Sequence, residues 1–336
     1  MRTVAVRAGV RRVAVIGTGS AGLMHLRALR ELDAVESIAI PRRRERVEEL
    51  AAMGECASRD LSEAVASGAT LGIIATDTGR HLEDSLAALE HGLDVLIEKP
   101  LAINATDAVR LRATALETGR KLFVGCVLRF SESLNTFRSL LKEIGRVHSV
   151  RVECQSYLPD WRPDRPYQES YAARRTEGGV LLDLIHEIDY AGWLFGWPEA
   201  VQARCRNLGR LGIAEEEAVD LTWETAEAKC ISMRLDYLTH PPRRLMRACG
   251  EQGTLEWDGI AGVVTLDLAR KAPQVVRSSQ TKVEMFVAQA SAFLRACRDE
   301  QNQRLATAED GVRALAVCDA ARRASQSKRE EPVVIP

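Results

Sequence analysis

A glycine-rich turn near the start of the chain limits the fold more than any other feature. The stretch RRVAVIGTGSAGLMHLRALREL begins with a short apolar, β-branched run, passes through three glycines, and continues with leucines at helical spacing. In a strand–turn–helix unit, the first glycine permits the tight turn, the second lets the backbone approach a pyrophosphate, and the third lets helix and strand pack closely. The pattern predicts a dinucleotide cradle, and a purely structural turn is the alternative. The cradle residues are Gly17, Thr18, Gly19, Ser20, Ala21 and Gly22.

Strands alternate with helices through the first 125 residues. The apolar segments SIAI, TLGIIAT, DVLIEKP and KLFVG are separated by helical patterns such as ERVEELAAMG and HLEDSLAALEHG. This alternation predicts an α/β Rossmann-type fold with a parallel, doubly wound sheet. Ligands of such sheets bind beyond the carboxyl ends of the strands, so Glu98, Lys99 and Pro100 are expected at the cofactor edge.

The segment after the second strand carries arginines where NAD-binding proteins usually carry an Asp or Glu for the ribose 2′-hydroxyl. The chain reads PRRRER there, with Arg42, Arg43 and Arg44 in succession. An arginine fork can hold a 2′-phosphate through two parallel hydrogen bonds. The sequence therefore favours NADP(H) over NAD(H), with Arg42 and Arg43 as cofactor contacts. A solvated charge run at the start of a helix is the alternative.

After Gly125 the hydrophobic pattern changes to a period of two. Segments such as VHSVRVECQSYL, EAVQARCRNL and VVTLDLARK alternate apolar and polar residues between Gly- or Pro-containing turns. They predict a largely antiparallel, open sheet with one face covered by helices. We therefore expect a dinucleotide-binding domain over residues 1–125, whose first ten residues are an extension. An α+β substrate and oligomerisation domain should span residues 126–336, with a late helix at about 307–325 that returns toward the first domain.

The composition is that of an ordinary globular protein. With 46% hydrophobic residues, 28% charged residues and a net charge of −1, the chain favours neither a nucleic-acid nor a membrane partner. The eight cysteines are scattered, without the spacing of metal ligands. We therefore expect reduced thiols, a cytoplasmic location and no metal site.

The stretch EGGVLLDLIHEIDY concentrates titratable side chains in an apolar segment. At about 100° per residue of a helix, Asp183, His186, Glu187 and Tyr190 share one arc, which alone favours a solvent-exposed face. However, Trp193 and neighbouring apolar groups border that arc, so the helix is expected to be buried. Because buried carboxylates and imidazoles need partners, a proton-transfer site in a cleft is the competing interpretation.

Several motifs resemble the Gfo/Idh/MocA oxidoreductase family. They are the glycine turn followed by His25, the stretch IATDTGRHLEDSLAALEHGLDVLIEKPLA, and VGCVLRF. Asp77 departs from the proline that many relatives carry. GGVLLDLIHEID resembles a second family motif in the short form of one subgroup, Asp-x-x-His-Glu-x-Asp-Tyr, with Ile185 in place of the serine of that form.

The resemblance implies an NAD(P)-dependent oxidoreductase that moves a hydride between nicotinamide C4 and a secondary hydroxyl or ketone of a sugar, cyclitol or sugar derivative. Lys99 would stabilise the substrate oxygen and His186 would carry the proton. Asp183, the third catalytic candidate, either contacts the substrate or only orients its neighbours. The further cofactor contacts that the resemblance implies are Ala75, Thr76, His81, Glu98 and Lys99.

Arginines beside aromatic rings suit a polyhydroxylated ligand. Arg129 and Trp161 are therefore the preferred additional substrate contacts, beside Lys99, Asp183 and His186, and packing is the alternative for each. Family members often dimerise through the open sheet face, which implies a homodimer or homotetramer. Two other functions are possible: NAD-dependent glycosidase-type chemistry by transient oxidation, and a non-catalytic NADP-binding sensor.

Overall fold

The computed structural model describes residues 10–161, 163, 166–228 and 230–336. The chain divides into two compact units. The first comprises residues 1–102, 107–127 and 281–309, and the second comprises residues 103–106, 128–280 and 310–336. The extension expected over the first ten residues lies outside the described residues, apart from Val10.

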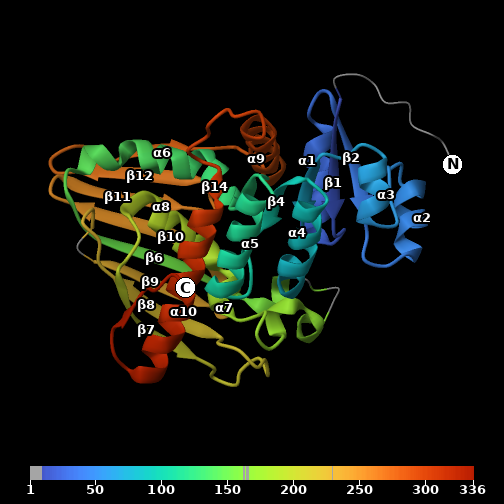
Figure 1. Ribbon diagram of the computed structural model, residues 1–336. Helices are drawn as coiled ribbons and strands as arrows, with labels where there is room; N and C mark the ends of the chain where they lie inside the picture. The colour runs from blue at the N-terminus through green and yellow to red at the C-terminus, as the bar shows by residue number, and fades with distance from the viewer. Residues whose placement is uncertain (1–9, 162, 164–165, 229) are drawn as a thin grey trace. The chain divides into compact units, whose positions relative to one another are not determined.

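A six-stranded sheet forms the centre of the first unit, in the order β14-β5-β4-β3-β1-β2 (Figure 1). Strands β1 to β5 are parallel, and β14 is antiparallel to β5. All four residues of β3 and the last five of β1 are buried, as expected for a sheet covered on both faces. The strands are β1 (Arg11–Ile16), β2 (Val35–Ile40), β3 (Leu71–Ile74), β4 (Asp94–Glu98), β5 (Leu122–Gly125) and β14 (Ala306–Thr307).

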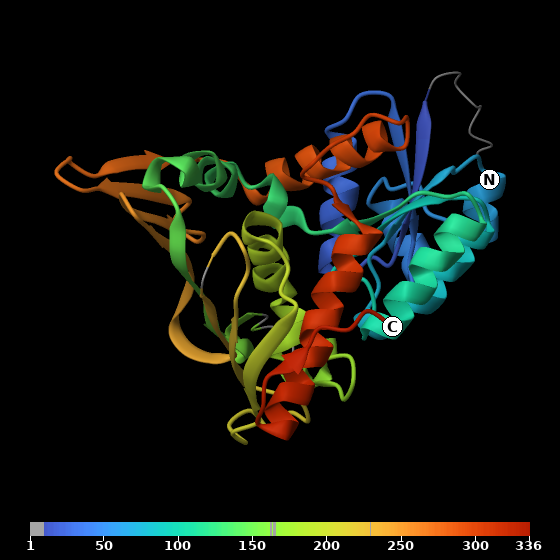
Figure 2. The same ribbon diagram turned by 60° about the vertical axis from the view of Figure 1, so that its left-hand side comes forward.

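Helices flank this sheet and confirm the doubly wound α/β prediction. Figure 2 shows α9 beside α1 on one side of the sheet and α5 on the other. α9 begins with a capping box, in which Thr281 and Glu284 satisfy each other's backbone N–H groups. The helices are α1 (Ser20–Arg30), α2 (Glu45–Ala52), α3 (Leu61–Ala66), η1 (Thr78–Arg80), α4 (His81–Glu90), α5 (Ala105–Glu117), whose first two residues belong to the second unit, and α9 (Lys282–Ala296).

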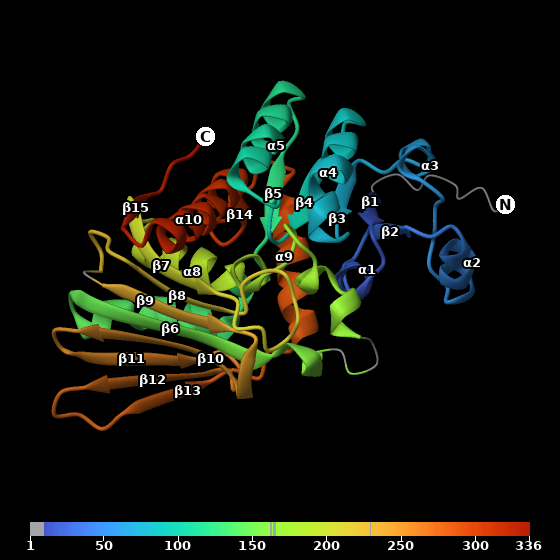
Figure 3. The ribbon, with the colours of Figure 1, turned by 90° about the horizontal axis from the view of Figure 1, so that it is seen from below.

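The second unit is built on a nine-stranded sheet in the order β13-β12-β11-β10-β6-β9-β8-β7-β15 (Figure 3). Neighbouring strands are antiparallel except for β6 and β9, which are parallel, so the predicted largely antiparallel sheet is confirmed. The strands are β6 (Val147–Tyr157), β7 (Ala200–Arg206), β8 (Ala218–Trp223), β9 (Ile231–Asp236), β10 (Leu238–Gly250), β11 (Gly253–Asp258), β12 (Val263–Leu268), β13 (Gln274–Arg277) and β15 (Glu331–Pro332).

Helices of the second unit include α8 and the long α10, which occupies the region of the expected late helix. Among the helices that the structure describes, none has both the length and the apolar character needed to cross a membrane. The elements are η2 (Val127–Phe130), α6 (Glu132–Leu140), η3 (Leu141–Ile144), η4 (Leu158–Trp161), η5 (Tyr167–Glu169), η6 (Tyr171–Ala173), α7 (Val180–Asp183), α8 (Ile185–Phe195) and α10 (Ala308–Ser327). Val127 of η2 and residues 308–309 of α10 belong to the first unit.

The polar stretch does not form one continuous helix. α7 ends at Asp183, Leu184 has a ψ of 28°, and α8 begins at Ile185. A helical ψ is close to −42°, so the helix is interrupted at Leu184. The prediction that Asp183 and His186 share one helical arc is therefore wrong, because it assumed a rotation of about 100° per residue through the whole stretch. The expected burial is confirmed: Asp183 is 4% exposed and Glu187 is fully buried.

Candidate functional site

The glycine turn between β1 and α1 leaves an open space in the backbone. Gly17 has a φ of +92°, and a Cβ there would lie 2.6 Å from the Ala75 carbonyl oxygen. A Cβ on Gly22 would lie 2.0 Å from the Gly17 carbonyl oxygen. At Gly19, by contrast, a Cβ would meet no described atom within 4 Å. Two glycines are thus required by the protein's own backbone, and the third keeps open the space that a pyrophosphate needs.

The start of α1 supplies the donors for an anion. Gly19 caps the helix without a side-chain hydrogen bond among the described residues, and the first turn, which begins at Ser20, carries no acidic residue. Backbone N–H groups at such a terminus, together with the positive end of the helix dipole, favour a phosphate. These features fit a dinucleotide.

The arginine run after β2 is exposed. Arg42 and Arg43 lie on the surface, and Arg42 Nη1 is 3.8 Å from Asp84 Oδ1. Arg46, which the sequence analysis did not single out, donates from Nε to Thr18 Oγ1 at 3.1 Å, and so joins α2 to the glycine turn. The only sequence signal for this contact was the last arginine of PRRRER.

The segments that follow β3 and β4 are tied together by His81. This residue is 1% exposed, with Nδ1 2.7 Å from the Pro100 oxygen and Nε2 3.1 Å from the Thr76 oxygen. Burial lowers the pKa of His81, and the hydrogen bonds to the two carbonyls oppose that shift. Thr76 also donates from its hydroxyl to Asp84 at 2.8 Å. Ala75 and Thr76 therefore share one network with the segment that carries Lys99.

Glu98 and Lys99 stand at the end of β4. His25 Nε2 lies 2.7 Å from Glu98 Oε1, at hydrogen-bond distance, and the Lys99 backbone N–H donates to Glu98 Oε2 at 3.3 Å. Lys99 itself is half-buried. The first unit thus brings the glycine turn, Arg42, Ala75, Thr76, His81, Glu98 and Lys99 to the carboxyl ends of its parallel strands.

In the second unit, two tyrosines hold Asp183. The Tyr171 hydroxyl donates to Oδ1 at 2.8 Å, and the Tyr237 hydroxyl donates to Oδ2 at 3.2 Å. A small cavity of about 20 Å³, lined in part by Asp183, Tyr171 and Trp161, lies beside this carboxylate. Such a volume holds roughly one water-sized group. His186, half-buried, stands in the first turn of α8.

Two buried ion pairs hold α8. Arg129 is 1% exposed and binds Asp189 through Nε and Nη2, at 2.9 and 2.7 Å, and its Nη1 lies 3.3 Å from Asp310 Oδ2. Glu187 accepts a 2.8 Å hydrogen bond from Arg244 Nε. The two parallel hydrogen bonds between Arg129 and Asp189 favour a packing role for Arg129 over substrate binding.

We expect Tyr237→Phe to lower the free energy of unfolding by about 1–3 kcal/mol, because a buried carboxylate loses a hydrogen-bond donor. Tyr190→Phe is the matched control. The Tyr190 side chain is equally buried, and its hydroxyl makes no hydrogen bond of normal geometry to the described residues, although Glu187 lies close enough to help raise its pKa. Urea unfolding of both variants measures the difference, and equal losses would contradict the anchoring of Asp183.

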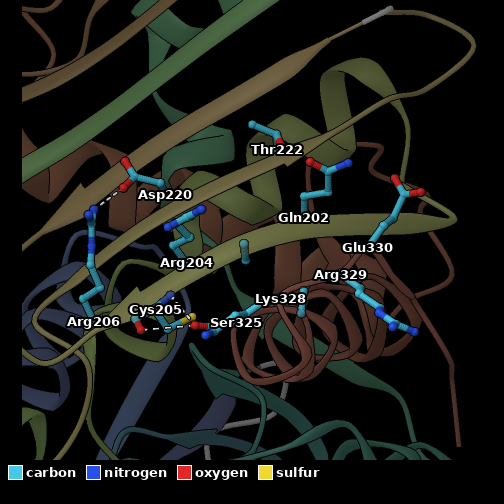
Figure 4. A pocket seen from close by; sticks show the side chains of 12 residues that line it. Gln202, Arg204, Cys205, Arg206, Asp220, Thr222, Ser325, Lys328, Arg329 and Glu330 are labelled. Atoms are coloured by element: carbon cyan, nitrogen blue, oxygen red, sulfur yellow. Dashed lines mark hydrogen bonds and ion pairs between the residues drawn. The ribbon is translucent and has the colours of Figure 1, made fainter.

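A wider cavity than the one beside Asp183 lies elsewhere in the second unit. It measures about 550 Å³, and β7, β8 and the end of α10 form its walls (Figure 4). Arg204, Arg206, Lys328 and Arg329 line it, but none of the predicted site residues does. Within the described parts of the chain, no group of three or more His, Cys, Asp and Glu residues could hold a metal ion.

Several curated proteins with similar sequences are dehydrogenases. The inositol 2-dehydrogenase of Burkholderia ambifaria is 26% identical over 341 residues, which cover 96% of each chain. The scyllo-inositol 2-dehydrogenase (NADP(+)) of Bacillus subtilis is 31% identical over 39% of this chain and 36% of its own length. The 2,7-anhydro-N-acetylneuraminate hydratase of Mediterraneibacter gnavus is 27% identical over 55% of this chain, and the match spans half of that protein.

Among solved structures, a levoglucosan dehydrogenase in complex with NADH has a TM-score of 0.87 at 18% identity, over 96% of this chain and 99% of its own. That likeness shows the fold. Two family models match the chain: "Oxidoreductase family, NAD-binding Rossmann fold" over residues 11–126, and "GFO/IDH/MocA C-terminal domain" over residues 136–256. The predicted class of enzyme, an oxidoreductase acting on CH-OH groups, is confirmed at the level of the family. The chain therefore belongs to the Gfo/Idh/MocA oxidoreductase family.

Proposed function

We propose that this protein is an NAD(P)-dependent oxidoreductase that interconverts a secondary hydroxyl and a ketone on a sugar, cyclitol or sugar derivative. The observation that carries the proposal is that Lys99 follows β4 and the glycine cradle follows β1, so both lie at the carboxyl ends of strands in one parallel sheet. Ligands of open α/β sheets bind at that edge. The inositol dehydrogenases among its relatives support the substrate class.

The proposed roles follow from the chemistry of each side chain. When bound, the nicotinamide ring supplies or accepts the hydride. The Lys99 ammonium donates a hydrogen bond to the substrate oxygen and stabilises its developing negative charge. The His186 imidazole takes the hydroxyl proton during oxidation and returns it during reduction.

The remaining candidates support these groups. Both oxygens of Asp183 accept tyrosine hydroxyls, so we assign this residue to fixing the α7–α8 junction just before His186. Trp161 donates from Nε1 to Ser156 at 2.9 Å and lines the small cavity beside Asp183, where a substrate hydroxyl fits. Arg129 keeps α8 in place through Asp189.

Two features of the proposal come from the family resemblance. The short motif, with two residues between Asp183 and His186, supports the proposal that the chain is a member of the subgroup that carries this form of the motif. The open face of the nine-stranded sheet is proposed as the contact surface of a homodimer or homotetramer. The domain boundary at about residue 125 and a cytoplasmic location belong to the same proposal.

The cofactor is proposed to be NADP(H), since Arg42 and Arg43 are exposed where a 2′-phosphate is received. We expect the double variant Arg42→Ser/Arg43→Ser to weaken NADPH binding about tenfold or more, because each charge-assisted contact contributes roughly 1.5–3 kcal/mol. NADH binding should change less than about threefold. Calorimetric titration measures both dissociation constants. The control for total charge is the double variant Arg110→Ser/Arg120→Ser, which removes two other exposed arginines of the first unit. Equal losses of affinity for NADPH and NADH would contradict a role of Arg42 and Arg43 in selecting NADP(H).

A panel of sugars, cyclitols and nucleotide sugars, monitored at the nicotinamide absorbance, tests the function. Turnover that consumes added NADP⁺ or NADPH supports the proposal. Glycosidic cleavage without added cofactor would instead indicate transient oxidation by a retained dinucleotide. Binding of the dinucleotide without turnover of any compound in either direction would favour the sensor.

A further inference from the structure

His25 lies behind the Glu98–Lys99 segment, entirely within the first unit. It stands in the second turn of α1 and is 1% exposed. The edge of its ring meets Phe286, with centroids 4.9 Å apart and planes at 71°. Its Nε2 lies 2.7 Å from Glu98 Oε1. An ionised carboxylate only accepts hydrogen bonds, so the proton of this bond is on Nε2.

The Glu98 carboxylate is held from three directions. His25 holds Oε1 from α1, and the backbone N–H of Lys99 reaches Oε2 at 3.3 Å. On β5, a Cβ at Gly125 would lie 3.1 Å from Oε1, so the glycine avoids a tight contact with the carboxylate there. The side chain is 12% exposed, and its conformation is therefore set by the protein rather than by solvent.

The charges around Glu98 keep it ionised. The groups that act on it are His25 from α1, Lys99 from the end of β4 and His81 from α4. Burial raises the pKa of the Glu98 carboxyl, but His25, through its hydrogen bond and charge, together with Lys99 and His81, more than offsets that effect. The net result is a pKa below the usual range, and a negative charge beside Lys99 at neutral pH.

We propose that His25 is a positioning residue that keeps Glu98 in place and ionised, and so maintains the positive charge of Lys99. This inference rests on the proposed role of Lys99. A neighbouring negative charge favours the ammonium form of a lysine. If His25 is removed, the half-enclosed carboxyl loses its best donor, burial favours the neutral acid, and the Lys99 ammonium loses its proton at lower pH.

The inference is tested on the protein without cofactor. The rate at which an amine-reactive label modifies Lys99 is followed against pH by mass spectrometry. We expect the labelling midpoint to move down by about one pH unit in both His25→Leu and Glu98→Gln. Lys142, whose side chain is 81% exposed, is the control in the same samples and keeps its midpoint. His25→Gln retains an N–H donor and should stay close to the wild type.

An unchanged Lys99 midpoint in Glu98→Gln would overturn the inference, even if His25→Leu fails to fold. A lower melting temperature in His25→Leu with an unmoved midpoint would do the same, since it indicates packing alone. The pH at which kcat/KM falls on the alkaline side should shift in each variant by the same amount as the Lys99 labelling midpoint. Full activity of Lys99→Met would overturn the proposed function instead, so the two failures are distinguishable.

Discussion

Lys99→Met is expected to lower kcat by about a hundred- to a thousandfold, because a positioned charge at a developing oxyanion contributes roughly that factor. The substitution keeps the length and packing of the side chain but removes the ammonium. Dissociation constants for the dinucleotide should change less than about threefold, since the cradle lies at the β1–α1 turn rather than at β4.

The matched control is Lys142→Met, which removes a lysine from an exposed position in η3 and should retain wild-type turnover. Initial rates and fluorescence titration with the cofactor measure the two effects separately. A Lys99→Met variant with normal cofactor binding and normal turnover would contradict the proposed role of Lys99 at the substrate oxygen. A variant with normal kcat but a raised KM would reduce Lys99 to a substrate anchor.

The parallel strands of the first unit could be predicted because their signals are local. Short apolar runs, the glycine turn and the helical leucines each act within a few residues, and strands that alternate with helices predict a parallel sheet. The antiparallel β14 and the helix α9, which come from residues 281–309, were not predicted as parts of this unit. Likewise, the period-two pattern after Gly125 predicted the antiparallel sheet. The parallel pairing of β6 with β9 could not be predicted, since it depends on which distant strands meet.

The contacts that shape the candidate site also join residues far apart in the sequence. His25 and Glu98 are 73 residues apart, and Tyr237 and Asp183 are 54 apart, so no local pattern joins them. The break at Leu184 was missed for the same reason. A helical wheel assumes a constant rotation of about 100° per residue. It therefore cannot reveal that a tyrosine outside the helix binds Asp183, the last residue of α7.

Gly19→Ala should weaken dinucleotide binding about ten- to a hundredfold while leaving the melting temperature unchanged. A methyl group at this position meets no described protein atom within 4 Å, so the folded chain accommodates it. The same methyl group would fill the space through which the backbone approaches a pyrophosphate, and the loss therefore falls on the ligand alone. Differential scanning fluorimetry and cofactor titration report the two quantities.

Gly22→Ala is the opposite case and completes the test. Its methyl group would lie 2.0 Å from the Gly17 carbonyl oxygen, which belongs to rigid backbone and cannot move aside as a side chain would. Overpacking of this kind costs about 1–3 kcal/mol or more, so this variant should lose stability and binding together. If Gly19→Ala binds the cofactor as well as the wild type, the turn is structural and the dinucleotide lies elsewhere. If both variants lose stability equally, a methyl group at Gly19 must also contact the protein. That result would contradict the open space that the structure shows at Gly19.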